Sequence, residues 1–513
     1  MDLIGVDGPG WVDASTSPYR GLNPIASENY INSAVARHAY GVTTITAVAR
    51  YYALHGALAD FVAAKGLDTS AAAEFIRRAE VIYALVCMSH AETDEHLADM
   101  PQPHGERNLA RALASGTIDL SVLAGADRSA RYARPDWGFW NTYSTVTGLF
   151  GITDGLGPGK NYDREVVAPA FQGVIGLAEA GDSVGLDDVR HLHEACLCRA
   201  STAADGEWLA DLFVGRPKDG TTIAAVVGQT LRLIDAAIAT GRIRGPGDVT
   251  EEVLYTDLVA VHDRSAKIWK HWQGIFLRAE QVYAWNALWS ELCNGLDVAG
   301  AMTVEEFVDN LADRLDTSLS VGALLDSLPE LEANARSLAD AEHASGDLDD
   351  PSDARRVDIA IRCLGVGAKR WAAYAKWPTG DVTPASDPEV LFGFQGPPDG
   401  HHAAEELSPQ WTYRLFEQWR ERPLKEFGAH LGRTLLARHQ RVALSKASWR
   451  DGRLMLPIRV EAVDGIVFRR FDESSGYPSL RLNRILSMAR QVGIFAVDSD
   501  GVWHRGPRGG LLD

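Results

Sequence analysis

The sequence predicts a mainly α-helical, multidomain protein with a C-terminal α+β module that contains a β-hairpin and a winged-helix-like element. The chain has 513 residues and a mass of 55.7 kDa, more than one hydrophobic core normally holds, so about two to four domains are expected. Apolar residues recur at three- and four-residue steps through long segments, as they do along the buried face of a helix. The last fifth instead alternates apolar and polar residues around short turns, which is typical of strands.

The helices are predicted from this periodicity. Segment 268–292 shows it most clearly and carries tryptophans on more than one side, so we expect a central helix that contacts several neighbours. A capping box of Thr303 and Glu306 and the Ser408-Pro409 pair mark two further helix N-termini. The remaining helices are expected at 27–39, 43–65, 69–88, 162–180, 186–198, 221–240, 329–343, 353–376 and 424–446.

Changes in composition predict four consecutive regions. Residues 1–160 form an N-terminal helical domain with an irregular segment, and residues 161–376 form a central helical domain. Residues 377–409 are rich in proline and glycine and are predicted to be a linker. Residues 410–513 form the basic C-terminal module.

The end of the chain predicts how this module is built. The stretch RLMLPIRVEAVDGIVFRRF alternates apolar and polar residues around a VDG turn, as a hairpin does. A basic helix, a strand, a DSDG turn and a second strand follow, in the order of a winged helix, whose helix enters the DNA major groove. We therefore predict that DNA contacts come from Arg481, Arg484, Arg490, His504, Arg505 and Arg508.

The charge distribution limits where nucleic acid can bind. The formal net charge of −19 argues against a general nucleic-acid coat, because phosphate affinity comes mainly from Lys and Arg. Residues 401–513, however, hold 18 Lys and Arg against 13 Asp and Glu. If DNA is a partner, we expect it to meet this C-terminal fifth.

The cysteines and the apolar segments indicate a reducing compartment. Five cysteines are sparse and odd in number, which does not indicate a disulfide framework. The first residues lack the pattern of a signal peptide, and no apolar stretch approaches the roughly 20 residues that span a bilayer. We expect a cytoplasmic protein without membrane contact.

One dense cluster of metal-ligand residue types occurs, in the segment HLHEACLC. It contains His191, His193, Glu194, Cys196 and Cys198. Zinc sites favour spacings such as C-x2-C and H-x3–5-H, whereas these two cysteines are two positions apart. On the helix expected over 186–198 they point roughly 200 degrees away from each other. We therefore interpret them as small buried residues and predict neither a metal site nor a cofactor.

Three other motifs have an ordinary interpretation that we favour. GLGPGKN (155–161) lacks the first glycine and the Ser/Thr of a phosphate-binding loop and predicts a surface turn. RTLLARH (433–439) spaces Arg and His as some helical ribonucleases do, but such spacing is also common on a basic helix face. Asp472 and Glu473 are paired carboxylates that can hold magnesium, although such pairs more often lie in a solvated turn.

Three segments carry a family resemblance: GWVDAS (Gly10–Ser15), TAVARYYALHGAL (Thr46–Leu58) and EFIRRAEVIYALV (Glu74–Val86). Together with the C-terminal order of helix, Gly-Ile, strand, Asp-Gly and strand, they resemble uncharacterised bacterial proteins encoded in antiviral-defence islands, often near helicases or nucleases. The resemblance covers the two ends of the chain rather than its middle. It implies a partner protein in a multi-gene bacterial system, and it implies no catalytic residues.

The same motifs are also consistent with packing. Arg50, Tyr51 and Tyr52 are expected to close one helix face. Arg77, Arg78 and Glu80 are expected on the outer face of the next helix. Adjacent Arg and aromatic groups can stack on bases, but they more often join helix to helix by cation–π contacts. We favour the packing role.

Three functional hypotheses remain, because no complete catalytic motif occurs. The leading one is a non-enzymatic DNA-binding or scaffolding subunit of a bacterial antiviral-defence complex. The second is a metal-dependent nuclease whose site is scattered in sequence. The third is a pure protein-interaction scaffold, since fold does not fix function.

Overall fold

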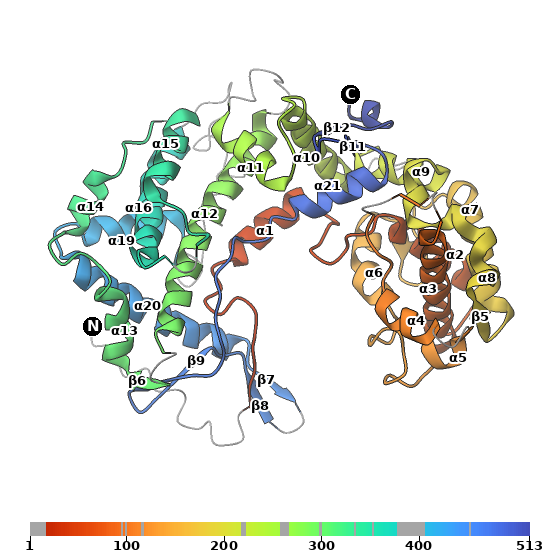
Figure 1. Cartoon of the computed structure of the whole chain (residues 1–513), viewed down its shortest axis with the longest axis horizontal. Coiled ribbons are helices and arrows are strands. Elements are labelled where there is room, and N and C mark those ends of the chain that lie inside the picture. The colour runs from red at the N-terminus through yellow and green to blue at the C-terminus, as the bar shows by residue number, and fades with distance from the viewer. Residues whose placement is uncertain are drawn as a thin grey trace. The chain divides into compact units, whose positions relative to one another are not determined.

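A computed structural model describes most of the chain. The described residues are 17–513 without 94–95, 98–99, 114–116, 217–221, 257–265, 297–299, 333–334, 351–352, 377–405 and 451–452. The predicted linker 377–409 therefore lies, except for its last four residues, outside the described residues. The prediction of a mainly helical protein is confirmed (Figure 1).

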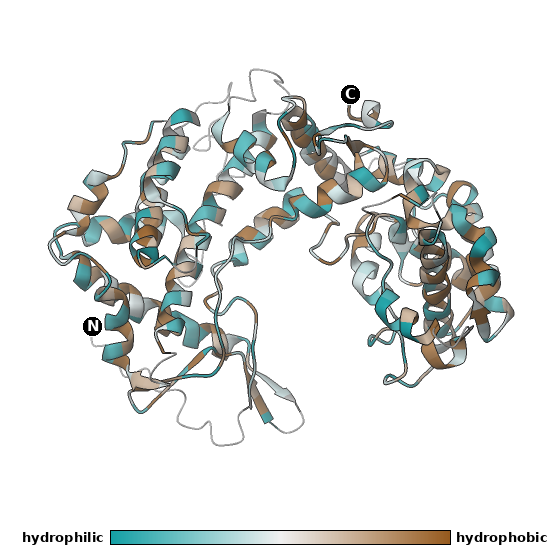
Figure 2. Ribbon diagram, in the orientation of Figure 1, coloured by the Kyte–Doolittle hydropathy of each residue, from teal (hydrophilic) through white to brown (hydrophobic). Residues whose placement is uncertain are grey.

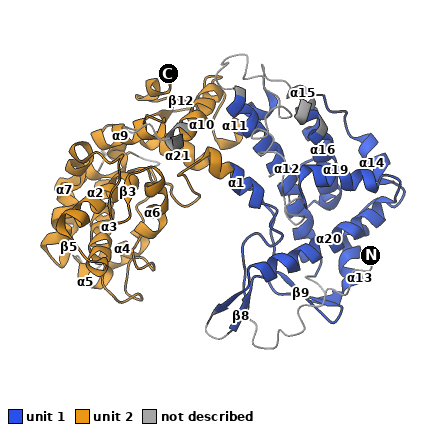
Figure 3. Cartoon of the chain, turned by 180° about the vertical axis from the view of Figure 1, so that it is seen from behind, with its two compact units in different colours: residues 1–34, 250–478 blue, residues 35–249, 479–513 orange. Residues whose placement is uncertain are grey.

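The chain forms two compact units, and each combines separate stretches of sequence (Figure 3). Unit 1 comprises residues 1–34 and 250–478, and unit 2 comprises residues 35–249 and 479–513. This division differs from the four consecutive domains predicted above. The predicted C-terminal module is shared: its hairpin belongs to unit 1, and its winged-helix-like element belongs to unit 2.

Unit 2 is built around two long helices, α2 (Arg50–Lys65) and α3 (Thr69–Ala91). The Asp68 carboxylate caps α3 by accepting hydrogen bonds from two backbone N–H groups of its first turn. α7 (Arg164–Ala180) packs against both helices, and α9 (Ala204–Phe213) packs against α2 and α7. The other helices that lie wholly within this unit are α4 (Glu106–Leu113), α5 (Leu120–Leu123), α6 (Trp140–Leu149), α8 (Leu186–Val189), α10 (Thr222–Ile238) and α21 (Leu482–Gln491).

Three short antiparallel strand pairs complete unit 2. They are β2 (Thr117–Asp119) with β5 (Ser183–Gly185), β3 (Thr153–Asp154) with β4 (Gly157–Pro158), and β11 (Phe495–Val497) with β12 (Trp503–Arg505). The GLGPGKN segment forms the β3–β4 turn and the residues after it, as the sequence predicts.

The C-terminal element follows the predicted order of helix, strand, turn and strand. It is joined closely to the N-terminal part of unit 2, because the Gln491 side chain accepts a hydrogen bond from Ala49 N and donates one to Ala47 O. The backbone N–H of Trp503 donates to Ile243 O, after α10. These long-range bonds explain why residues 479–513 belong to one unit with residues 35–249.

Unit 1 is organised by α12 (Ala266–Asn294), which packs mainly against α16 (Arg356–Lys376). The side chains of Trp272, Trp285 and Trp289 on α12 are fully buried, as expected for a central helix. Among the described residues, the other helices that lie wholly within this unit are α13 (Val304–Ala312), α14 (Val321–Ser327), α15 (Ala335–Ser345), α19 (Pro409–Gln418) and α20 (Leu424–Ser445). Both helix starts predicted from capping, at Thr303 and Ser408, are confirmed.

Two three-stranded sheets lie in unit 1. One has the order β6 (Ala301–Thr303), β10 (Ile466–Arg469) and β9 (Val460–Val463), and the other has the order β1 (Ser17–Pro18), β8 (Arg453–Leu456) and β7 (Ser448–Arg450). The predicted hairpin is β9–β10, with Val463 opposite Ile466. Asp464 and Gly465 connect the strands with φ of 51° and 75°, the left-handed values that a tight two-residue turn requires.

Two helices, α1 (Asn29–His38) and α11 (Pro246–Tyr255), contain residues of both units. Figure 2 shows hydrophobic residues along much of α3, in keeping with the burial of most of its side chains. Among the described residues, no helix is long and apolar enough to cross a membrane.

Candidate metal centre

The HLHEACLC segment does not form the helix that the sequence predicts, and this correction changes its interpretation. Two 3₁₀ segments, η1 (Arg190–Ala195) and η2 (Leu197–Ser201), replace the end of the expected helix. Between them Cys196 adopts φ −58° and ψ 147°, which is extended rather than helical. The helical argument that separated the two cysteines therefore does not apply.

The thiols of Cys196 and Cys198 instead lie 3.6 Å apart and meet two histidines from the end of α3 and the segment after it. Cys198 Sγ is 3.3 Å from His90 Nδ1, and Cys196 Sγ is 3.7 Å from His96 Nδ1. All four ligand atoms lie within 4.8 Å of one another. We call these four residues the metal centre.

These distances fit a tetrahedral zinc site. Zinc bonds of roughly 2.3 Å to sulfur and 2.0–2.1 Å to nitrogen place the ligands of a tetrahedron about 3.3–3.8 Å apart. The three measured ligand–ligand separations fall in this range. A disulfide requires a sulfur–sulfur distance of roughly 2.05 Å, and both cysteines are free. Two sulfur and two nitrogen ligands in this arrangement favour zinc among the common metals.

A buried arginine fixes the backbone that carries Cys196. Arg50 Nη1 donates hydrogen bonds to Glu194 O at 2.8 Å and to Cys196 O at 2.5 Å. Its Nε and Nη2 donate to the two carboxylate oxygens of Asp205, each at 2.8 Å. Arg50 is 1% exposed. Arg50 belongs to the TAVARYYALHGAL segment, for which we favoured a packing role. It plays that role here by holding the backbone that carries one ligand of the metal centre.

Hydrogen bonds among the cysteines, together with burial, shift the pKa values of the two thiols. The hydrogen bond from Cys198 lowers the pKa of Cys196, but the contact with Cys87 and burial outweigh it and raise that pKa to about 12. The hydrogen bond to Cys196 and burial also raise the pKa of Cys198. Both thiols are therefore neutral at physiological pH, and a bound cation has to displace their protons.

Of the five residues that the sequence cluster offered, two belong to the metal centre. His193 lies beside it, with its ring 4.7 Å from that of His90 and its Nε2 3.1 Å from Ser89 Oγ. His191 and Glu194 are exposed. His90 and His96 were not among the predicted residues. Their H-x5-H spacing matches a known zinc pattern, but the cysteines that they meet lie about 100 positions further along the chain. No local pattern in the sequence connects the two pairs.

The EFIRRAEVIYALV segment (Glu74–Val86) also differs from the prediction. Glu80 was expected on an outer helix face, but it is fully buried. It pairs with His55 Nε2 at 2.9 Å and accepts hydrogen bonds from the Tyr132 hydroxyl and from Phe139 N. Arg77 is also buried and donates to backbone carbonyls, among them Ala124 O. The motif forms a polar core inside unit 2.

Five of the six residues predicted to bind DNA make hydrogen bonds within unit 2. Arg481 Nη1 donates to Val42 O, and Arg484 Nε donates to Thr44 O, each at 2.9 Å. Burial lowers the pKa of Arg481. Arg490 is half-buried in the last turn of α21.

His504 and Arg505 of β12, and Arg508 after it, are engaged in a similar way. Arg505 donates to the carboxylates of Asp235 and Asp513, and the exposed His504 contacts Arg505 O through Nδ1. Arg508 donates to three backbone carbonyls, Ala200 O, Ala203 O and Val492 O. Because Ala200 lies in η2, Arg508 ties the C-terminus to the segment that carries the cysteines.

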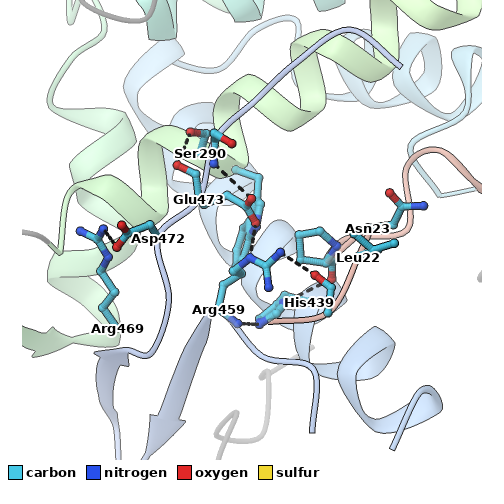
Figure 4. A network of polar contacts seen from close by, with 12 residues as sticks. Leu22, Asn23, Ser290, His439, Arg459, Arg469, Asp472 and Glu473 are labelled. Atoms are coloured by element: carbon cyan, nitrogen blue, oxygen red, sulfur yellow. Dashed lines mark hydrogen bonds and ion pairs between the residues drawn. The ribbon is translucent and has the colours of Figure 1, made fainter. Parts of the chain in front are cut away.

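The RTLLARH segment and the Asp472–Glu473 pair are the two remaining sequence candidates, and both lie in unit 1 (Figure 4). Arg459 contacts both His439 and Glu473. His439 is fully buried, and burial lowers its pKa to about 4. Its Nδ1 lies 3.0 Å from Pro24 O, and its Nε2 accepts a hydrogen bond from Arg459 N at 3.1 Å. Glu473 pairs with Arg459, whereas the exposed Asp472 pairs with Arg469. The two carboxylates therefore bind different arginines rather than sharing a metal.

Comparison with known proteins adds no family to this geometry. The chain matches no protein-family model, no curated protein and no solved structure.

Proposed function

We propose that this chain is a non-enzymatic scaffold protein whose unit 2 is stabilised by a bound zinc ion. The observation that carries the proposal is the convergence of His90, His96, Cys196 and Cys198 within 4.8 Å. Four protein ligands complete the tetrahedral coordination of zinc, whereas catalytic zinc sites keep one position open for water or substrate. A metal held in this way stabilises the fold, and the chain then acts by binding other molecules.

The cellular setting of the proposal rests on the sequence resemblance. We propose a subunit of a bacterial antiviral-defence complex that works beside a helicase or nuclease. A cytoplasmic location suits two cysteine ligands, because a reducing compartment keeps thiols from forming disulfides.

DNA binding is the second candidate function, and the positive balance of residues 401–513 favours it. It ranks below scaffolding because the guanidinium groups of Arg481, Arg484, Arg505 and Arg508 already donate to groups of unit 2. A donor that is used inside the protein is less available to a phosphate. DNA binding predicts an affinity that falls steeply with salt, and a nuclease predicts cleavage that depends on a divalent metal.

Elemental analysis tests the zinc proposal directly. We expect the purified chain to contain close to one equivalent of zinc that survives dialysis and is released by a strong chelator together with loss of helical signal in circular dichroism. Metal-free protein with an unchanged spectrum and melting curve would refute the proposal. Gel-shift assays at low salt, with and without Mg²⁺, separate the scaffold from the DNA-binding protein and the nuclease.

A further inference from the structure

A pocket in unit 1 shares no residue with the metal centre and has a volume of about 490 Å³. Ligand pockets in proteins commonly measure about 300–1,000 Å³. Its lining includes Arg20, Glu28, Trp289, Arg459, Glu473 and Tyr477. The pocket therefore combines two cationic and two acidic side chains with two aromatic rings.

One wall of the pocket is the loop of residues 20–28, which basic side chains hold in place (Figure 4). Lys446 Nζ donates to Leu22 O at 2.8 Å and to Asn23 O at 2.9 Å. Arg459 Nη2 donates to Gly21 O, and Arg438 donates to the carbonyls of Ile25 and Ala26.

The backbone of this loop is also strained. Asn23 and Ala26 have φ of 49° and 50°, in the left-handed region that alanine rarely adopts. Such conformations persist only where the surroundings impose them, and they cluster at ligand sites. The loop is thus a preformed wall that does not need to be ordered by a ligand.

One nitrogen of the Arg459 guanidinium has no hydrogen-bond partner among the described residues. Arg459 is 4% exposed; its Nε donates to Glu473 Oε2 at 2.9 Å and its Nη2 donates to the loop. Nη1 is buried and has no hydrogen-bond partner among the described residues. A buried charged donor without an acceptor is costly, and charged donors prefer anionic oxygens.

The charges around the pocket limit what the ligand can be. The two lining arginines are balanced by Glu28 and Glu473, so the pocket has no surplus positive charge for a phosphate with two negative charges. Glu473 is already paired with Arg459 and accepts a hydrogen bond from Trp289 Nε1 at 3.2 Å. Glu28 contacts two side-chain amides, that of Asn286 at 3.4 Å and that of Asn23 at 2.9 Å, and burial raises its pKa. Two amide contacts leave the carboxylate room to accept a further hydrogen bond.

We propose that this pocket binds a small zwitterion of the α-amino-acid class. The ligand carboxylate accepts a hydrogen bond from Arg459 Nη1, and the ligand ammonium group donates to Glu28. The inference is independent of the zinc proposal, because all of these residues lie in unit 1.

The test uses the full chain and the free proteinogenic amino acids at millimolar concentration, with sodium acetate and inorganic phosphate as comparison ligands. We expect at least one amino acid to raise the melting temperature of unit 1 in a concentration-dependent way, as selective binding to the folded state does. Calorimetric titration then gives its affinity. Acetate should bind more weakly, because it cannot reach Glu28 with an ammonium group, and phosphate should not bind.

Glu28→Gln is the decisive variant, because it keeps the shape of the side chain and removes its charge. We expect it to fold with an unchanged melting temperature and to bind the amino acid about tenfold or more weakly, the loss of one charge-assisted hydrogen bond. Arg453→Gln, an exposed arginine of β8 outside the pocket lining, serves as the matched control and should bind normally. Binding of phosphate alone, equal binding by Glu28→Gln, or no binding by any of these compounds would each overturn the proposal.

Discussion

Each unit contains a buried arginine that donates hydrogen bonds to backbone carbonyls: Arg50 in unit 2 and Arg459 in unit 1. The two differ in how many of their nitrogens have a partner. In unit 2, all three nitrogens of Arg50 that can donate are used: two by Asp205 and the third by carbonyls beside Cys196. In unit 1, Arg459 uses two nitrogens in a similar way and leaves Nη1 without a partner among the described residues. We call Arg50 the saturated arginine because each of its three nitrogens has a partner, and Arg459 the unsaturated arginine because Nη1 is left for the ligand that we propose.

The difference shows that burial and ion pairing alone do not separate structure from function. Arg50 and Arg459 are both nearly inaccessible, and both are paired with a carboxylate. What separates them is a complete count of hydrogen bonds, since a buried polar group in a folded protein normally has a partner. Substitutions around the two arginines should therefore have different consequences for stability and binding.

The largest effect is expected from removing the cysteine ligands. Replacing Cys196 and Cys198 by Ser removes both thiolates, and structural zinc contributes on the order of 10 kcal/mol of apparent binding free energy in small domains. We expect loss of bound zinc and loss of the cooperative unfolding transition of unit 2, measured by elemental analysis and calorimetry. Cys363→Ser, at a half-buried cysteine of unit 1, is the matched control and should keep its zinc. Full zinc content in the double variant would place the metal elsewhere.

Breaking the saturated arginine should have the next largest effect. Arg50→Gln leaves the Asp205 carboxylate buried without its partner, and breaking a buried pair in this way costs about 3–5 kcal/mol. The change should be visible in chemical denaturation and should also weaken zinc retention, because the backbone at Cys196 loses its support. Arg50→Lys should not restore stability, because a lysine cannot make the two-pronged contact. The exposed Arg128–Asp136 pair offers a control, and Arg128→Gln should change little.

Changes in pH test the surroundings of Arg459, because its backbone N–H donates a hydrogen bond to Nε2 of the buried His439. Burial lowers the pKa of His439 to about 4, compared with about 6.5 in the unfolded chain. The unfolded state therefore binds more protons between these values, so the contribution of His439 to stability is complete above pH 6.5 and is lost as the pH falls towards 4. The expected loss is about 3 kcal/mol. Unfolding of wild-type and His439→Gln proteins across this range should show a shallower pH dependence in the variant; identical slopes would mean that His439 is not neutral in the folded state.

The smallest effect is expected at the surface of unit 2. Arg505 is half-exposed and pairs with Asp235 and Asp513, and such pairs contribute about 0–1 kcal/mol. Arg505→Ala should therefore leave the melting temperature nearly unchanged. If the chain binds DNA through this residue, the slope of log affinity against log salt should fall by about 0.9, whereas the scaffold proposal expects no DNA binding to measure.

Local features of the fold were predictable because short-range rules control them. The period of apolar residues in 268–292 predicted α12, and the VDG turn predicted the β9–β10 hairpin, since few residues tolerate the left-handed values found at Asp464 and Gly465. The capping residues Thr303 and Ser408 marked two helix starts for the same reason. Each of these signals depends on neighbours within a few positions.

The sequence by itself thus determined the helical class, the hairpin and the chemical types available for a site. Only the tertiary structure decided that His90 and His96 meet Cys196 and Cys198, because the meeting depends on how α3 packs against η1 and on one extended residue between two 3₁₀ turns. It also decided that residues 479–513 join residues 35–249, through long-range bonds such as that between Ala49 and Gln491. The unpartnered Nη1 of Arg459 likewise could not be predicted from the sequence. Which hydrogen bonds a side chain makes depends on the neighbours that the folded chain brings to it.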